Sequence, residues 1–254
     1  MNHNIEAQYR TPVNLNTRIS IHEKYSTNPQ SFADWIVEHY DIHQHFRILE
    51  LGCGTADMWK NHRDLLKQNC RLILTDFSEG MLEQAKQNTA GWEHVDYKIV
   101  NIQDIPFDNE SFDAVIANMM LYHVPNLSRG LSEVRRVLKP GGKFYCATYG
   151  EHGIMEFIND TLRDQGIHGE IGRAFTLQNG ADSLKQHFAE VQMCTREDGL
   201  AITCVDDFVD YVLSMSSLTG ISELSRDVLY STFEKKMING ILYVPKEYGM
   251  FICK

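Results

Sequence analysis

An apolar stretch that runs directly into two glycines, at residues 48–55, constrains this chain more than any other part of its sequence. It reads Ile-Leu-Glu-Leu-Gly-Cys-Gly-Thr, and such an apolar run is typical of a buried parallel strand. Glycines after a strand let the backbone turn sharply and approach a ligand where a Cβ would clash. Because ligands of open α/β sheets bind at this end of the strands, the stretch predicts a nucleotide-like ligand. A tight strand-to-helix turn without a ligand remains an alternative.

The rest of the glycine loop argues against two common phosphate-binding sites. The dinucleotide fingerprint requires a third glycine where this chain has Asp57. An aspartate there would crowd the packing of helix on strand and place negative charge near a pyrophosphate, so a nicotinamide cofactor is disfavoured. A phosphate-binding P-loop is excluded because no Gly-Lys-Ser/Thr follows the glycines.

A second acidic residue follows the next predicted strand. Residues 71–75 indicate that strand, and Asp76 at its tip lies 22 residues after Gly54. A carboxylate at about this separation can accept hydrogen bonds from both hydroxyls of a ribose. Asp76 could also be an acid favoured at a helix N-terminus, where Ser78 would be the N-cap. The two interpretations are compatible.

Further segments extend the same pattern. Residues 97–100 indicate a third strand and residues 111–118 a fourth, and a Pro-Gly-Gly turn within residues 138–144 leads into a fifth. Taken in order and spacing, five motifs resemble the class I S-adenosylmethionine-dependent methyltransferases, in particular their small-molecule, methyltransferase-11-like branch. The motifs lie at residues 50–55, 76–82, 104–107, 111–115 and 138–142.

The resemblance implies a fold and a division of the chain. The expected architecture is a Rossmann-like, doubly wound α/β fold whose seven-stranded sheet is mostly parallel, with an antiparallel last strand. Residues 1–45 would form an N-terminal helical lid, and residues 46–150 the S-adenosylmethionine-binding core. Residues 151–254 would supply helices that cover the substrate and the final strands of the same domain.

The resemblance also implies roles in binding S-adenosylmethionine, whose product is S-adenosylhomocysteine. Glu50, Gly52 and Gly54 would pass under the methionine part and the ribose. Asp76 would hold the ribose diol, and Phe77 would lie against adenine.

Three further contacts follow from the same resemblance. Asn101, where relatives often have aspartate, can accept a hydrogen bond from the adenine amino group, and Ile102 can donate its backbone N–H. Asn118 would lie near the methionine carboxylate or amine, unless it is a polar strand end that the protein itself satisfies. Cys53 is interpreted as a small buried thiol and not as a nucleophile.

The N-terminal segment carries candidates for the lid. Residues 32–37 have helical spacing, and Arg18, His22 and Tyr25 would share one face of a preceding helix. In the functional interpretation Arg18 meets the cofactor carboxylate, and Tyr9 or His22 faces the substrate. In the alternative this face is solvated or packs against the protein.

The region after the fifth strand is expected to cover the substrate. Its pattern predicts helices at residues 154–165, 183–188, 206–216 and 222–239, and strands at 191–195 and 248–254. The methionine and aromatic residues of these helices would equally suit an ordinary core.

His123 is the candidate general base, because it follows the fourth strand beside the expected methyl site. The alternative is a histidine that packs against the cofactor or caps the next helix. No carboxylate and histidine cluster suggests a metal, so none is expected.

Composition limits the function. The net charge of −10 disfavours nucleic acid as the substrate, and no apolar run approaches the ~20 residues of a membrane span. Scattered cysteines and a polar N-terminus suggest a cytoplasmic protein. The resemblance implies a monomer or a homodimer that methylates an O, N, S or C atom of a small molecule. The alternatives are a cofactor-binding regulator or scaffold without turnover, and a methyltransferase acting on RNA or protein.

Overall fold

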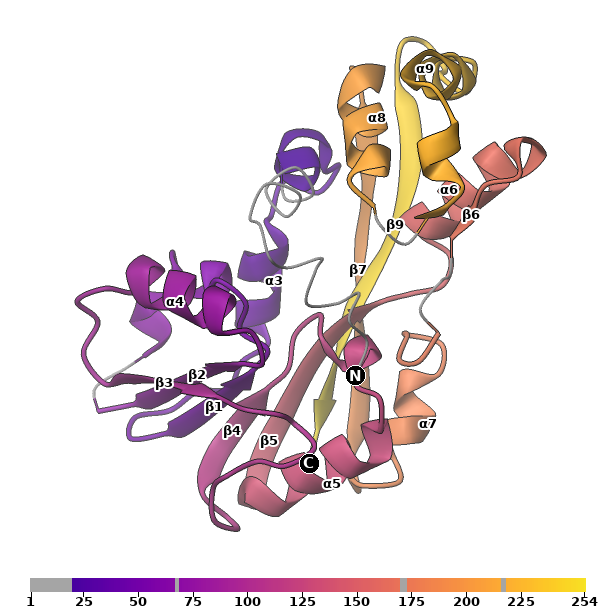
Figure 1. Ribbon diagram of the computed structural model, residues 1–254. Coiled ribbons are helices and arrows are strands. Elements are labelled where there is room, and N and C mark those ends of the chain that lie inside the picture. The colour runs from indigo at the N-terminus through magenta and orange to yellow at the C-terminus, as the bar shows by residue number, and fades with distance from the viewer. Residues whose placement is uncertain (1–19, 67–68, 170–172, 216–217) are drawn as a thin grey trace.

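A seven-stranded sheet organises the chain, seen here in a computed structural model that describes residues 20–66, 69–169, 173–215 and 218–254 (Figure 1). The strand order is β3-β2-β1-β4-β5-β9-β7, and only β9 runs antiparallel to its neighbours. This confirms the predicted mostly parallel sheet with an antiparallel last strand. The strands are β1 (Arg47–Leu51), β2 (Arg71–Asp76), β3 (Val95–Ile99), β4 (Phe112–Ile116), β5 (Leu138–Tyr149), β7 (Val191–Ile202) and β9 (Leu242–Cys253).

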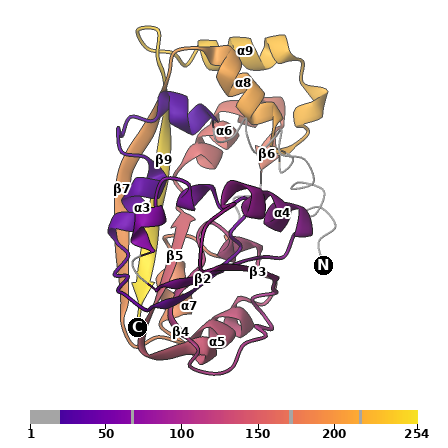
Figure 2. The same ribbon diagram turned by 90° about the vertical axis from the view of Figure 1, so that its left-hand side faces the viewer.

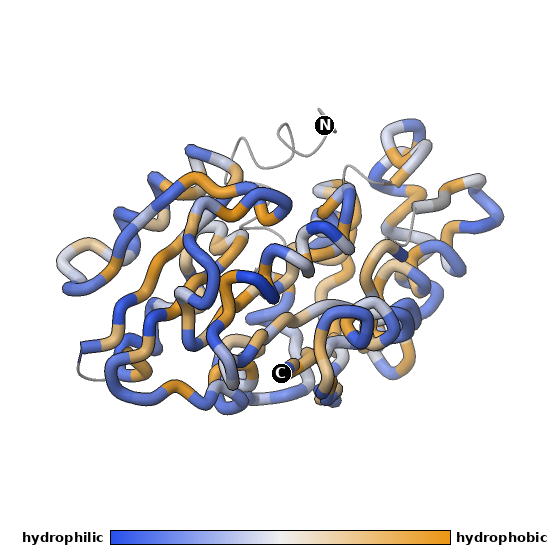
Figure 3. Tube along the Cα trace, turned by 90° about the horizontal axis from the view of Figure 1, so that it is seen from below, coloured by the Kyte–Doolittle hydropathy of each residue, from blue (hydrophilic) through white to orange (hydrophobic). Residues whose placement is uncertain are grey.

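Helices cover both faces of the sheet, because successive residues of its buried strands point to opposite sides. Ile48 packs toward α3 (Phe32–Glu38) and α4 (Glu79–Asn88), whereas Leu49 packs toward α5 (Leu127–Val137) and α7 (Gly180–Leu184). Figure 2 shows α4 and α5 on opposite sides of the strands, and in Figure 3 the outer loops are largely hydrophilic. The two apolar layers hold the sheet between them. The carboxyl ends of its parallel strands lie together along one edge.

The connection from β1 to β2 has no α-helix in its described part, residues 52–66 and 69–70. It contains two short 3-10 turns instead, η1 (Asp57–Trp59) and η2 (Arg63–Leu65). Ala56 adopts the left-handed conformation with φ 58° and precedes η1. The turn η1 directs Trp59 into the core, where it is completely buried.

A long ribbon of two strands rises beyond the rest of the sheet. The pairing of β5 with β9 ends at Tyr149 and Tyr248, but β7 and β9 remain paired as far as Ile202 and Leu242. Around this upper ribbon pack residues 20–25, which are helical, with α6 (Ile154–Leu162), α8 (Val205–Leu213) and α9 (Arg226–Glu234). They form a separate apolar cluster above the carboxyl edge of the sheet (Figure 1).

Several element boundaries differ from the sequence-based predictions. The predicted strands at 191–195 and 248–254 are only the lower parts of β7 and β9, because charged residues interrupt the apolar alternation above them. The helix predicted at 222–239 is broken, since Ser225 caps a new helix after η5 (Ile221–Glu223). The short helix predicted at 183–188 is shifted to α7.

The Pro-Gly-Gly turn also lies elsewhere than predicted. It falls inside β5, where the register with β4 shifts between Phe112 and Ala114. Gly141 adopts φ 77°, which suits a residue without a Cβ. A minor two-stranded sheet joins β6 (His168–Gly169) and β8 (Leu218–Thr219). No helix in the described part of the chain is long and apolar enough to cross a membrane.

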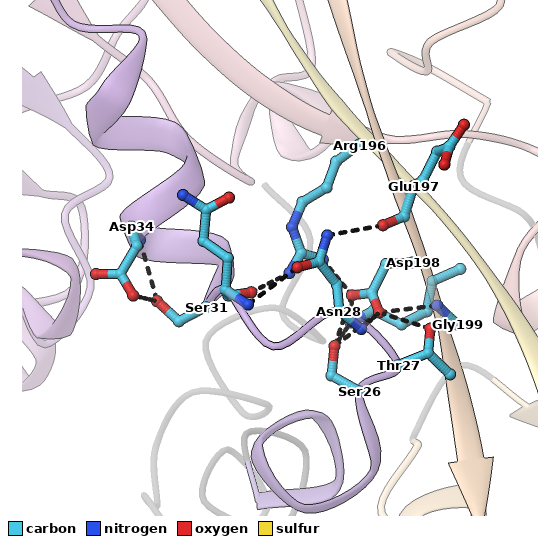
Figure 4. A network of polar contacts seen from close by, with 11 residues as sticks. Ser26, Thr27, Asn28, Ser31, Asp34, Arg196, Glu197, Asp198 and Gly199 are labelled. Carbon is cyan, nitrogen blue, oxygen red and sulfur yellow. Dashed lines mark hydrogen bonds and ion pairs between the residues drawn. The ribbon is translucent and has the colours of Figure 1, made fainter.

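A buried ion cluster fastens the segment that precedes α3 to the upper ribbon (Figure 4). The side chains of Arg196, Asp198 and Lys246 are at most 2% exposed, and both cations pair with the same carboxylate. Ser26 donates its hydroxyl to Asp198 at 2.7 Å, and the guanidinium of Arg196 donates to the carbonyl of Gln30. The cluster therefore joins the start of the core to the ribbon that carries the covering helices.

The charge state of this cluster is set by its cations. Burial acts to raise the pKa of Asp198, but the hydrogen bonds from Lys246 and Ser26 and the charges nearby outweigh it and hold that pKa well below its ordinary value. The carboxylate is therefore ionised at neutral pH.

Asp198→Asn should destabilise the fold by about 3–5 kcal/mol, because it leaves two buried cations without a counter-charge. Urea unfolding followed by circular dichroism at pH 7 measures this. The matched control is Glu197→Gln on the same strand, whose residue is exposed and whose change should stay within about 0.5 kcal/mol. Equal stabilities of the two variants would contradict a structural role for the cluster.

Candidate functional site

The glycine loop lies where the carboxyl ends of β1 and β2 meet. Gly52 has φ 68°, and a Cβ on it would lie 2.9 Å from Cγ of Met120, so both conformation and space require glycine there. The backbone N–H of Gly54 donates to Oδ2 of Asp76 at 2.9 Å. The N–H of Cys53 donates to the carbonyl of Thr75 at 2.8 Å. The loop is thus held closed against the tip of β2.

Asp76 anchors the loop and lies at the start of α4, as the helix-terminal interpretation expects, whereas its role in holding a ribose stays a prediction. Its Oδ1 accepts the backbone N–H of Ser78 at 2.8 Å, and Ser78 in turn caps α4. Burial raises the pKa of Asp76, while backbone N–H groups, among them that of Ser78, act to lower it. Each carboxylate oxygen thus accepts one of these backbone N–H groups, and the side chain remains partly exposed.

Glu50 is the second carboxylate of the loop, at the end of β1. It is 4% exposed, and its Oε2 accepts the indole N–H of Trp59 at 2.5 Å. Burial raises the pKa of Glu50 to about 7; the Trp59 hydrogen bond lowers it, and the charge of Asp76 raises it further. Neither carboxylate forms an ion pair with a lysine, arginine or histidine of the described residues. The loop therefore concentrates negative charge that the protein does not neutralise.

The predicted adenine-side residues follow β2 and β3. Phe77 is 46% exposed, which is unusual for a large apolar ring, and Ile102 is buried. Oδ1 of Asn101 accepts the backbone N–H of Gln103 at 2.9 Å and so stabilises its own turn. One lone pair of that oxygen is therefore engaged within the protein.

Asn118 follows β4 and is fixed by the protein on both sides of its amide. Its Nδ2 donates to the hydroxyl of Tyr40 at 2.7 Å, and its Oδ1 accepts the N–H of Ala147 at 3.1 Å. This supports the alternative in which Asn118 is a polar strand end satisfied by its surroundings. Burial also raises the pKa of the Cys53 thiol, as expected of a thiol that is not a nucleophile.

His123 belongs to η3 (Leu121–His123) and begins a row of aromatic side chains. Its ring centroid lies 4.5 Å from that of Tyr122, which lies 4.7 Å from that of Tyr149. Tyr149 pairs directly with Tyr248 across β5 and β9, so these two side chains leave the sheet on the same face. Burial lowers the pKa of His123 and so favours a neutral ring at physiological pH.

His22 reaches the same row from the covering side. Its ring centroid lies 6.0 Å from those of Tyr211 and Tyr248. Burial, followed by the charge of Lys246, lowers the pKa of His22 to about 3, and its buried Nδ1 has no hydrogen-bond partner in the described part of the chain. Arg18 and Tyr9 lie outside the described residues.

The structure brings together most of the predicted residues and adds others. Glu50, Gly52, Gly54 and Asp76 share one loop, whereas His22 and His123 lie at the two ends of the tyrosine row. Trp59 was not predicted as a site residue, because it belongs to none of the motifs recognised in the sequence. Among the described residues, no three or more His, Cys, Asp or Glu side chains are grouped as a metal site would need.

Comparison with known proteins identifies the region that contains the loop. A family model described as a methyltransferase domain matches residues 49–146. The demethylmenaquinone methyltransferase of Clavibacter sepedonicus is 40% identical over 103 residues, which cover 41% of this chain and 41% of that protein. The chain thus spans about two fifths of the length of this curated relative.

Solved structures agree on the fold. The YcgJ protein of Bacillus subtilis superposes with a TM-score of 0.62 at 16% identity and covers 87% of this chain and 96% of its own. Phosphoethanolamine N-methyltransferase 2 of Haemonchus contortus, solved with phosphomonomethylethanolamine and S-adenosylhomocysteine, superposes with a TM-score of 0.61 at 16% identity. That match covers 98% of this chain and 58% of the other.

Glu50→Gln should make the ligand-free protein more stable at pH 8 by about 3 kcal/mol, since one pKa unit corresponds to about 1.4 kcal/mol. The folded pKa of Glu50 exceeds its ordinary value of 4.5, so the native state binds the extra proton between pH 4.5 and about 7. Wild-type stability therefore falls as pH rises through that window.

Denaturant unfolding of both proteins at pH 4 and pH 8 tests this. The difference should be small at pH 4 and appear fully at pH 8, whereas Glu93→Gln at an exposed position should show no difference at either pH. A Glu50→Gln variant less stable than wild type at pH 8 would contradict the charge penalty.

Proposed function

We propose that this chain transfers a methyl group from S-adenosylmethionine to a small-molecule acceptor, a proposal supported by the methyltransferase-domain model that matches residues 49–146. The observation that carries the proposal is the pair of carboxylates of buried Glu50 and partly buried Asp76, which have no cationic partner among the described residues. S-adenosylmethionine bears two positive charges, on its sulfonium and its amine, and a ribose diol that a carboxylate can hold.

The proposed cofactor contacts follow the positions of the side chains. Asp76 accepts from the ribose hydroxyls while its backbone bonds hold it in place, and Glu50 faces the amine. Gly52 and Gly54 let the loop backbone pass beneath the ligand. Phe77, whose ring is exposed beside Asp76, covers one face of adenine.

Three other contacts complete the proposed cofactor site. The free lone pair of Asn101 and the backbone N–H of Ile102 read the adenine edge. Asn118, held by Tyr40, borders the methionine end, and Arg18, outside the described residues, meets the carboxylate.

The proposed reaction is an in-line displacement at the methyl carbon, for which bound S-adenosylmethionine supplies an activated methyl group. What the protein adds is alignment of the acceptor and exclusion of water. The upper ribbon and its helices stand above the carboxyl edge of the sheet, where they can close this space (Figure 1). Residues 1–45 would then act as the lid, 46–150 as the cofactor core and 151–254 as the cover.

We place the acceptor against the tyrosine row between His123 and His22. Nearby charges are paired with one another in the cluster of Arg196, Asp198 and Lys246, so the row itself offers rings and hydroxyls. His123 is the better general base, because a histidine whose pKa lies near 3 is too weak to remove protons at neutral pH. Neutral His22 can instead accept a hydrogen bond from the acceptor.

The net charge and the cysteines of the chain also support the proposal. The net charge of −10 supports a small-molecule acceptor in preference to nucleic acid. All six cysteines are unpaired, which supports a reducing compartment such as the cytoplasm for a protein that acts as a monomer or homodimer.

Asp76→Asn should weaken the binding of S-adenosylmethionine by about 10- to 100-fold, because it replaces charged hydrogen bonds worth about 1.5–3 kcal/mol by neutral ones. Isothermal titration calorimetry at pH 8 measures the dissociation constant. Asp96→Asn, on the exposed part of β3, is the matched control and should bind as wild type does. Wild-type protein that binds no S-adenosylmethionine would refute the proposed function.

His123→Gln should lower turnover by about 100-fold or more while leaving the cofactor dissociation constant unchanged, if His123 removes the acceptor proton. Transfer of a radiolabelled methyl group to a panel of phenols, quinols, amines and thiols identifies an acceptor for this measurement. The rate of the wild type should fall at acidic pH as His123 becomes protonated, and the variant should lose that dependence. Unchanged turnover would assign His123 to packing alone.

A further inference from the structure

Trp59 occupies an unusual place for a large side chain with a polar group. It is completely buried beneath the glycine loop, and its indole N–H donates to Oε2 of Glu50 at 2.5 Å. This is the hydrogen bond that the described residues provide to the Glu50 carboxylate. A buried tryptophan N–H needs a hydrogen-bond acceptor, and a neutral acceptor would suffice. Burying a carboxylate for this purpose costs free energy, which is expected only where the negative charge has a function.

The local backbone is built so that Trp59 can reach this position. In doubly wound folds the helix after the first strand directs its N-terminus, and hence its positive dipole end, toward the ligand. Here Ala56 turns into the left-handed conformation, and the short turn η1 follows in place of an α-helix. The loop therefore lacks the usual helix dipole, and the indole N–H is the donor that faces the first carboxylate.

The other groups around Glu50 do not neutralise it. Asp76 on β2 adds negative charge, and burial raises the pKa values of the Cys53 thiol and the Tyr40 hydroxyl, which keeps both groups neutral near pH 7. Trp59 is thus the neighbour that favours the ionised form of Glu50. A protonated Glu50 would lose its attraction for a cation.

We propose that Trp59 is a positioning residue of the loop, whose indole N–H holds the Glu50 carboxylate ionised and oriented toward the amine of the cofactor. The inference rests on the proposed function only for the identity of the cation. The link between Trp59 and Glu50 exists in the ligand-free protein and can be tested there.

The first experiment uses the protein without cofactor. In a Trp35→Phe/Trp92→Phe background Trp59 is the remaining tryptophan, and its fluorescence should change with pH around a midpoint near 7 as Glu50 ionises. Adding Glu50→Gln should abolish that transition while circular dichroism confirms the fold. Fluorescence that is flat between pH 5 and 9, or a transition that survives Glu50→Gln, would overturn the proposed link.

The second experiment measures the binding of S-adenosylhomocysteine, which retains the amine, between pH 6 and 9. Trp59→Phe keeps most of the ring volume but loses the donor, so its affinity should fall about tenfold at pH 7 and approach that of the wild type at pH 9. Trp92→Phe, which removes an indole packed near Arg63, should follow the wild-type profile. In a Glu50→Gln background, Trp59→Phe should change affinity less than twofold.

These outcomes separate the inference from the proposed function. A pH-independent loss of affinity in Trp59→Phe would assign Trp59 to packing and overturn the inference, while cofactor binding by the wild type would still support the function. Wild-type protein that fails to bind at every pH would refute the function, and the fluorescence titration would still decide whether Trp59 controls Glu50.

Discussion

The uncompensated negative charge beneath the glycine loop is the constraint on which the site depends. Two carboxylates, from the ends of β1 and β2, lie at one loop, and both have pKa values raised by burial. Such an arrangement opposes folding, because desolvating a carboxylate without a partner costs free energy. The sheet tolerates it because two apolar layers hold the strands from either side. A ligand that brings positive charge recovers this energy when it binds.

The same sheet carries a second group of buried charges, and these charges have partners of opposite sign within the protein. Around Asp198 on the upper ribbon, two cations of the chain pair with one carboxylate, which also accepts hydrogen bonds from a hydroxyl and a backbone N–H (Figure 4). Hydrogen bonds and ion pairs shared within such a buried network hold its members in place. This contrast separates a structural cluster, which holds the covering region in place, from a binding site that awaits its counter-charge.

The sequence was sufficient to predict the parallel strands, the glycine loop after β1 and the acid at the tip of β2. These features arise from short-range patterns, namely apolar strands, glycines that follow a strand and acids at strand tips, whereas the antiparallel last strand was expected only from the family resemblance. The upper ribbon was not predicted in full, because Arg196, Asp198 and Lys246 look like solvated residues until their pairing across strands is known. Trp59 was missed for a similar reason, since its partner lies nine residues earlier and only the turn at Ala56 brings the two together.

The charge of the loop also bears on the direction of the proposed reaction. Methyl transfer converts the sulfonium of the donor into a neutral thioether but leaves its amine unchanged, so the ligand loses one of two positive charges. Carboxylates that are buried or partly buried, as Glu50 and Asp76 are, discriminate between these states more strongly than solvent-exposed ones would. In the proposed site Asp76 would keep its hydrogen bonds to the ribose in both states, whereas the electrostatic attraction of the pair for the product would be weaker. In the proposed site the loop thus favours replacement of the bound product by fresh S-adenosylmethionine. The degree of ionisation of Glu50 determines how large this difference in affinity is.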